Sequence, residues 1–530
     1  MIGPSTSLGK SSMPAGPGGT DDAMMMPSPA GGMAPMMAKP ALAVDERPAD
    51  AAATGPDKDL ADKLLRWCDP TQTKNIADEL EADVLAKIGD RVLRDFKIDD
   101  LSRDGWMKKS EEAMKLAMQV AEDRTTPWPN SSNVVYPLIT VGAIQFNARA
   151  YPAIVQGRNV VKGVVIGQDF GTPQVDPASG QPMMDQRTQQ PVWKVQPGAK
   201  RARAKRIADH MSWQFLEEQS EWEEDTDKLL LILPIIGCCF RKTYFATNLG
   251  RNASALVNSK KFVVNYWARS IETAPRTSEI IEFYPNEIEE MIRAGLFLRQ
   301  DYKVMGSTTT DDDAPIEFIE QHRLWDLDGD GYEEPYIVTA HKSSGKVARV
   351  VAGYEADGII FSGETHEVAR IKREQYYTKY DFIPNPDGGF YGVGFGQLLG
   401  PINDSVNTVI NMLIDAGTLS INGGGFIGRG FSLHGGSLRR KMGEWTFVNA
   451  PGGAIRDAIV PLTPPEPSQV LFTLLGSLIE AGKEIASVKD VLTGGEAGTA
   501  AMQPTTLLAL IEQGLKVFTA IFKRIHRAAK

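Results

Sequence analysis

The sequence is poor in the residues that build disulfide frameworks, zinc sites and most hydrolase centres. It has 3 cysteines in 530 residues, and Cys238 and Cys239 are adjacent in an apolar stretch, which argues against a disulfide framework or a CxxC metal site. Its 6 histidines are scattered, and no HExxH, GxSxG or GxxxxGK[ST] pattern occurs. We therefore predict a protein that is not an enzyme, requires no cofactor and assembles in a reducing cytoplasm.

Long apolar runs and an excess of cations are also missing. The longest apolar run, "LLLILPIIGCCF" at 229–240, is too short to cross a bilayer and contains Pro234 and Gly237. It predicts a buried helix end that turns into a strand. The N-terminus has no basic region followed by an apolar core, so we expect neither a signal peptide nor a membrane partner. The formal net charge of -10 argues against a surface that grips nucleic acid everywhere, but it is compatible with local DNA contact.

The remaining composition is that of a folded protein, with 42% hydrophobic and 23% charged residues. Residues 1–57 are the exception, because their Gly, Pro, Ala, Met and Ser content predicts a disordered arm. Helical spacing dominates 58–122, whereas alternating apolar residues make 315–375 rich in strands. Helices that precede strands in this way predict an α+β fold.

The stretch "DLDGDGYEEP" at 326–335 resembles the start of a calcium loop. An EF-hand needs helices on both sides and a bidentate glutamate at position twelve, but the flanks suggest strands and position twelve is Ile337. We therefore expect an acidic β-hairpin turn, with a weaker alternative in which it holds Ca²⁺. The candidate ligands are Asp326, Asp328, Asp330 and Glu334.

The last third of the chain alternates between long helices and glycine-rich segments. The pattern predicts helices at 394–421 and 466–492, short strands in the glycine-rich segment 422–465, a loop at 493–504, and a helix over 505–530.

Five segments in this order resemble the portal proteins of tailed bacteriophages, in a podovirus-like branch. They are "PWPNSSNVVYPLI", "VVNYWARSIETAPRTSEIIEFYPNEIEEMIRAGLF", "DLDGDGYEEPYIVTAH", "NPDGGFYGVGFGQLLGPINDSVNTVINMLIDAG" and "QPTTLLALIEQGLKVFTAIFKRIH". The resemblance covers about residues 60–530. It implies a wing at 58–393, a first stem helix at 394–421, a clip at 422–465, a second stem helix at 466–492, a tunnel loop at 493–504 and a crown helix at 505–530, which is short or truncated.

The resemblance also implies a function and a set of partners. Portal proteins form a homododecameric ring at one vertex of the virion capsid, through which double-stranded DNA is packaged and ejected. The implied partners are the terminase large subunit, the head–tail adaptor and tail proteins, and the major capsid and scaffolding proteins. Two other functions remain open, namely a calcium-dependent binding protein built around 326–335 and another phage head-completion ring.

A DNA conduit must surround a polyanion without holding it, so its lining should carry few cations. The segment 394–421 has no Lys or Arg, and a polar residue recurs every four positions along it. With two residues of the tunnel loop, this band gives the predicted channel lining: Asn403, Asn407, Asn411, Asp415, Glu496 and Met502. The alternative interpretation of the band is an ordinary solvated helix face.

Two basic clusters are candidates for docking. The clip cluster would meet an acidic partner or a phosphate, or else form a charged rim; it comprises Arg429, Arg439, Arg440 and Lys441 with Trp445 nearby. The denser cluster, "KRARAKR" at 200–206, is either a functional surface or the ion-pair partner of the acidic "EEQSEWEED" at 217–225.

Overall fold

The computed structural model describes most of the chain from residue 63 to residue 422 and parts of it thereafter. The gaps before 423 are 70–71, 156, 158, 176–180, 186, 188–189, 247–248, 303–310, 312, 328–330 and 362–367. Beyond 422 the described residues are 424–427, 432–433, 448–449, 459–462, 468–486 and 518–530. The arm predicted at 1–57 and the tunnel loop predicted at 493–504 lie outside the described residues.

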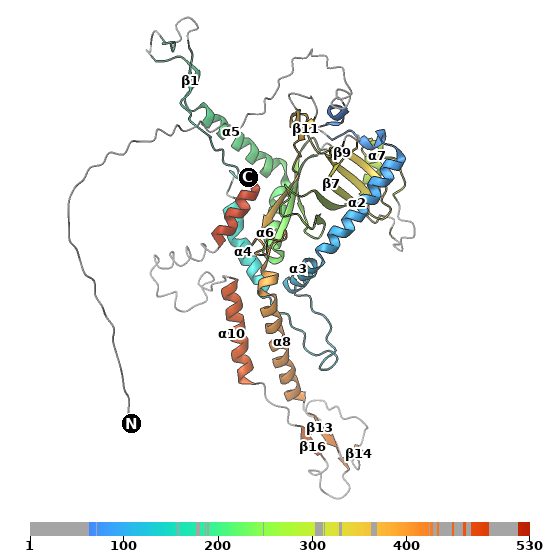
Figure 1. Cartoon of the computed structure of the whole chain (residues 1–530). Helices are drawn as coiled ribbons and strands as arrows, with labels where there is room; N and C mark the ends of the chain where they lie inside the picture. Colours follow the sequence, from blue (N-terminus) through green and yellow to red (C-terminus); the bar gives the residue numbers. More distant parts are fainter. Residues whose placement is uncertain are drawn as a thin grey trace, which may run out of the picture. The chain divides into compact units, whose positions relative to one another are not determined.

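The largest sheet is a five-stranded antiparallel meander (Figure 1). Its strands, each paired with the next, are β5 (Phe262–Val264), β6 (Arg276–Phe283), β7 (Ile316–Trp325), β8 (Glu334–His341) and β9 (Val347–Ala352). Successive side chains face opposite sides of the sheet. Ile319 packs with Ile88 and Val92 of helix α2 (Ala82–Ser102), whereas Phe318 packs with Ile288 of α7 (Pro285–Arg293).

A smaller sheet, ordered β12-β3-β4, contains β3 (Cys238–Ala246), β4 (Arg251–Val257) and β12 (Tyr377–Asp381). Helix α6 (Ser220–Ile236) leads directly into β3 through Gly237, which has a φ of +104°. A Cβ atom at Gly237 would lie 2.5 Å from the backbone nitrogen of Gly394, so both the conformation and the close approach favour glycine. The predicted turn from a buried helix end into a strand is confirmed.

Several further elements surround these sheets. The helical ones are 63–67, η1 (Ile76–Glu79), α3 (Asp104–Ala117), α4 (Leu138–Ile154), α5 (Ala199–Trp213), the π-helix η2 (Gln214–Glu218) and η3 (Ala356–Gly358). The strands are β1 (Thr172–Pro173), β2 (Trp193–Val195), β10 (Ile359–Phe361) and β11 (Val368–Ile371). Among the described residues of 152–195 the strands are short, since β1 has two residues and β2 has three.

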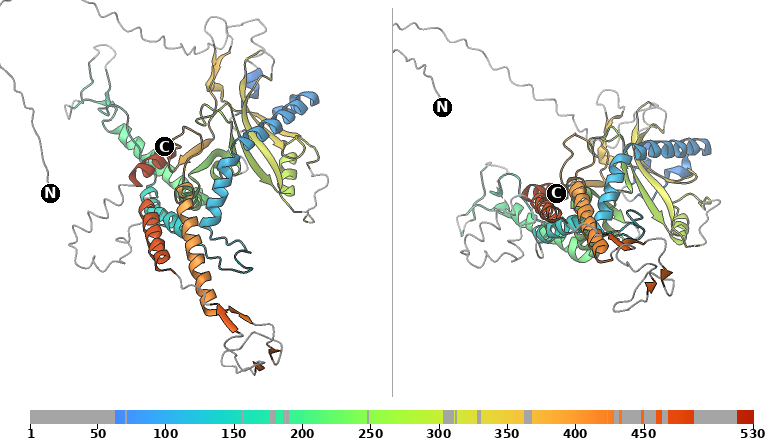
Figure 2. Two further views of the ribbon diagram at one scale, coloured as in Figure 1. Left: turned by 60° about the horizontal axis from the view of Figure 1, so that its bottom comes forward. Right: turned by 90° about the horizontal axis from the view of Figure 1, so that it is seen from below.

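Two long helices in the last third pack side by side (Figures 1 and 2), namely α8 (Phe395–Asn422) and α10 (Gln469–Ile485). They run antiparallel, because Ala486, just after α10, lies in one apolar cluster with Phe395 at the start of α8. The same cluster includes side chains of α4, α6 and the helical residues 518–529. Among the described residues, none of the helices has the length and apolar character needed to span a bilayer.

Short antiparallel strand pairs lie in the segment between α8 and α10. β13 (Gly424–Ile427) pairs with β16 (Ile459–Leu462), and β14 (Ser432–Leu433) pairs with β15 (Val448–Asn449). The predicted α+β class is confirmed, as are the long helix over 394–421 and short strands within 422–465.

Candidate functional site

Polar side chains of α8 hold alternate residues of the extended segment 131–136, which precedes α4. Three backbone N–H groups donate to these side chains: Tyr136 to Asn407 Oδ1 at 2.7 Å, Val134 to Asn411 Oδ1 at 2.7 Å, and Ser132 to Asp415 Oδ1 at 2.8 Å. We call this set of contacts the amide ladder.

The ladder fits because two different backbone repeats match. Four residues of an α-helix rise about 6 Å. Two residues of extended chain rise about 6.6 Å, and their N–H groups point the same way. Acceptors spaced four apart on a helix therefore meet donors spaced two apart on an antiparallel extended segment. The segment is extended because Pro127, Pro129 and Pro137 disfavour helix around it.

Further hydrogen bonds reinforce the middle and the end of the ladder. Asn411 Nδ2 donates to the carbonyl of Val134 at 3.0 Å, so one carboxamide satisfies both backbone groups of that residue. Ser132 Oγ donates to the carbonyl of Asn411 at 2.9 Å. The charge of Asp415 is countered by Arg124, whose guanidinium lies 3.9 Å from the carboxylate.

Asn403 lies four residues before the first rung and is fully buried, but neither atom of its carboxamide has a hydrogen-bond partner among the described residues. The pattern places residue 138 opposite it. Pro137 ends the extended segment and α4 begins at Leu138, whose N–H donates to the carbonyl of Tyr136 instead. The ladder therefore stops one rung short.

These positions correct the predicted channel lining. Asn403, Asn411 and Asp415 are buried within the chain and Asn407 is half-buried, so the prediction of an outward-facing polar band is wrong. Carboxamides suit this buried position because each can donate to and accept from a backbone. The exposed side of α8 instead carries Asp404, Ser405, Thr408, Met412, Ile414 and Thr418.

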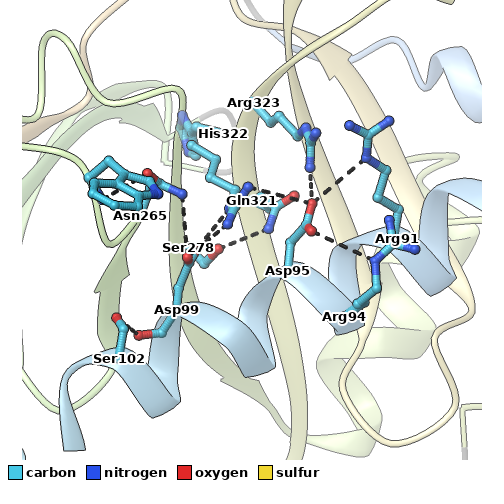
Figure 3. A network of polar contacts seen from close by, with 12 residues as sticks. Arg91, Arg94, Asp95, Asp99, Ser102, Asn265, Ser278, Gln321, His322 and Arg323 are labelled. Carbon is cyan, nitrogen blue, oxygen red and sulfur yellow. Dashed lines mark hydrogen bonds and ion pairs between the residues drawn. The ribbon is translucent and has the colours of Figure 1, made fainter.

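A second polar network fastens α2 to the five-stranded sheet (Figure 3). Asp99 is almost fully buried and accepts two hydrogen bonds from Arg276, at 2.6 Å and 2.8 Å. Asp95, one turn earlier, pairs with Arg323 of β7. Because both carboxylates are paired inside the structure, this network positions the helix and leaves no free acid for chemistry.

A third cluster joins the two sheets around Lys242 of β3. Its ammonium donates to Glu320 of β7 at 2.6 Å and to Glu279 of β6 at 3.2 Å. The Tyr377 hydroxyl of β12 donates to the same two carboxylates, at 2.7 Å to Glu279 and 3.1 Å to Glu320. The His322 ring nitrogen lies 2.9 Å from Glu320. Every member therefore has a partner within the cluster, and the cluster links the smaller sheet to the five-stranded sheet.

Burial and charge set the protonation of the side chains in this cluster. Burial opposes the ionisation of Glu320, but Lys242 and His322 outweigh it and hold the pKa of Glu320 well below its usual range. Burial lowers the pKa of His322, which favours the neutral imidazole. Burial raises the pKa of Glu279 despite the nearby ammonium. Sequence reasoning missed this cluster because Lys242, Glu279, the Glu320–His322 pair and Tyr377 are separated by tens of residues and follow no spacing rule.

The acidic loop lies, as predicted, between two antiparallel strands, β7 and β8. Asp326 accepts the N–H of Gly331 at 3.1 Å, and Glu334 is fully buried as the first residue of β8. Asp328 and Asp330 lie outside the described residues. Within the described part of the chain, no group of three or more His, Cys, Asp or Glu side chains is arranged to hold a metal ion. The Ca²⁺ site stays a prediction.

The other predicted site residues lie in segments that the structure does not describe. They are Glu496 and Met502 of the tunnel loop, and the clip residues Arg429, Arg439, Arg440, Lys441 and Trp445. The amide ladder replaces them as the best-defined feature of the last third of the chain. Its signal in the sequence was the four-residue repeat on α8 together with a proline-flanked segment that must be extended.

Comparison with known proteins adds no assignment to this geometry, since no protein-family model and no curated protein matches the chain.

Proposed function

We propose that the chain is a portal protein, the subunit of a ring at one capsid vertex through which double-stranded DNA is packaged and ejected. The observation that carries the proposal is the antiparallel pair α8 and α10, joined by a segment with short strand pairs and anchored to the α/β part by the amide ladder. In a portal these would be the two stem helices and the clip. The ring would dock the terminase and the tail adaptor.

Uncovered apolar side chains on the two helices support assembly. α8 exposes Leu398, Met412, Ile414 and Leu419, and α10 exposes Val470, Phe472, Leu474 and Ile485. On α10, only Gly482 is buried. A helix with so much exposed apolar surface favours a protein neighbour, and a head-to-tail interface that closes produces a ring.

The charge of the helices supports a conduit. α8 has no Lys or Arg, and α10 has only Lys483. A channel lined by cations would bind phosphates and slow the passage of DNA, whereas neutral side chains would not. On the exposed side of α8, Thr408 and Met412 are neutral and Asp404 is acidic.

The proposal is tested by native mass measurement and by class averages of the purified protein viewed along its axis. We expect a ring of about a dozen subunits with a central hole, as closed cyclic assembly requires. Phe472→Asp, which places a charge in the uncovered apolar surface, should disrupt the ring, whereas Ser477→Asp on the same helix serves as the matched control. A wild-type protein that stays monomeric at high concentration would refute the proposal.

A further inference from the structure

The segment 159–213 leaves many apolar side chains in solvent. From here on we call this segment the arm; it is distinct from the N-terminal arm predicted at 1–57. Among the described residues, eleven large apolar side chains of the arm are exposed: Val164, Ile166, Phe170, Val175, Met183, Met184, Trp193, Val195, Ile207, Met211 and Trp213. Ile166 is 92% exposed. Of the long helix α5, only Ala208 and Ser212 are buried. Apolar surface on this scale indicates a docking surface.

The arm is also basic, and its helix α5 carries several exposed cations. Arg203, Lys205 and Arg206 of α5 are exposed and form no ion pair with any described residue. The alternative in which "KRARAKR" pairs with the acidic stretch downstream is not what the structure shows. Of those acids, Glu221 pairs with Arg251 and Glu224 pairs with Lys228.

The charge of the arm is opposite to that of the rest of the chain. Residues 159–213 contain eight Lys and Arg residues and four Asp residues, a net charge of +4. Since the formal net charge of the whole chain is -10, the remainder carries -14. A second copy of this chain is therefore an electrostatically complementary partner for the arm.

An acidic hollow lies on α4 and α6. A hollow of about 500 Å³ is lined by Tyr151, Ser220, Glu223, Glu224 and Asp227. The Tyr151 hydroxyl donates to Glu223, and this bond is the main cause that raises the pKa of Tyr151 to about 12, so the phenol stays neutral. The hollow is acidic: it contains Glu223, which accepts from Tyr151, and Glu224, which pairs with Lys228 of the same helix.

We propose that the arm of one copy docks on the acidic hollow of a second copy, with the basic end of α5 against the carboxylates and the apolar side chains of the arm covering the surface around them. The arm and the hollow are different faces of one chain, so the contact is head-to-tail and can repeat around a ring. The inference deepens the proposed portal function by naming a contact between its subunits. It does not require that the assembly conduct DNA.

The test exchanges charge between the two faces. An arm variant carries Arg203→Glu and Arg206→Glu, a hollow variant carries Glu223→Lys and Glu224→Lys, and a third protein carries all four changes. Lys87→Glu with Lys97→Glu, two exposed lysines of α2, is the matched control for net charge. Assembly is followed by mass photometry and sedimentation, and folding by circular dichroism.

We expect the arm variant and the hollow variant each to weaken assembly by about tenfold or more. The control should assemble like the wild type, and the protein with all four changes, the four-fold variant, should recover assembly. If the hollow variant misfolds, Glu224→Lys alone replaces it, because Glu224 is an exposed side chain whose ion pair among the described residues is with exposed Lys228. Single-face variants that assemble normally, or a four-fold variant without recovery, would overturn the proposal. Loss of binding to a labelled DNA duplex in the arm variant, with assembly intact, would also overturn it.

These outcomes separate the two proposals. Rings that persist in the arm variant remove the arm contact and leave the portal function standing. If the wild type forms only open or small assemblies and these respond to the charge exchange, the arm contact is supported and the proposed ring is refuted.

Discussion

Removing one rung of the amide ladder should release the segment 131–136 from α8. Asn411→Ala deletes both hydrogen bonds between Asn411 and Val134, at 2.7 Å and 3.0 Å. Each such bond contributes about 0.5–1.5 kcal/mol net, so the docked state should lose about 1–3 kcal/mol. This loss corresponds to an increase of about 5- to 150-fold in the population of the undocked segment.

Hydrogen exchange with residue-level mass spectrometry measures this opening directly. In the wild type, the amides of Ser132, Val134 and Tyr136 should exchange slowly, whereas those of Asn133 and Val135, which have no acceptor among the described residues, should exchange fast. Asn411→Ala should accelerate the three slow amides and leave the two fast ones unchanged.

Met412→Ala is the matched control, because Met412 is the next residue and is 52% exposed on the other side of α8. It should leave exchange in 131–136 unchanged. Asn411→Asp keeps an acceptor for the N–H of Val134 but loses the donor to its carbonyl, so its effect should be intermediate. Equal protection of odd and even residues in the wild type, or no acceleration in Asn411→Ala, would refute the ladder.

The remaining predictions concern the two buried polar clusters. Burial lowers the pKa of His322, so its proton is bound more weakly in the folded than in the unfolded chain, and stability should fall as the pH drops below about 6.5. In His322→Gln the melting temperature should therefore change less between pH 7 and pH 5 than in the wild type. An unchanged slope of melting temperature against pH would contradict this. Glu320, whose folded pKa is depressed, should add a further loss below about pH 4.3 that Glu320→Gln removes. Asp99→Ala leaves Arg276 without its main partner and should cost about 3–5 kcal/mol in denaturant unfolding, whereas exposed Arg94→Ala should cost less than about 0.5 kcal/mol.

Residues that end helices and the periodic spacing of apolar residues predicted most of the fold. The turn after α6 followed from Pro234 and Gly237 within one apolar run, since an αL glycine ends a helix and leaves the next apolar residues to a strand. The long helix α8 followed from apolar residues at helical spacing. These features depend on neighbouring residues, and the sequence therefore contains the information that specifies them.

The direction in which the band on α8 faces could not be predicted in the same way. A four-residue polar repeat marks one side of a helix but does not say whether that side meets water or another backbone. Asn407 and Asn411 suit both environments, because a carboxamide offers a donor and an acceptor. The choice is made by the segment 131–136, whose N–H groups need acceptors and which lies some 270 residues away in sequence.

The amide ladder also bears on why α8 can be free of cations. A long helix that docks through ion pairs needs Lys or Arg on one partner, and in a conduit such side chains could bind passing phosphates. Here the docking bonds come mainly from neutral carboxamides, and the one carboxylate, Asp415, is countered by Arg124 from outside the helix. The side of α8 that docks on the segment 131–136 can therefore be polar while the exposed side of the same helix, which we call its outer side, carries no cation. Under the proposed function, the side chains that meet DNA or a neighbouring subunit are those on the outer side, including Asp404, Thr408 and Met412, and not the asparagines.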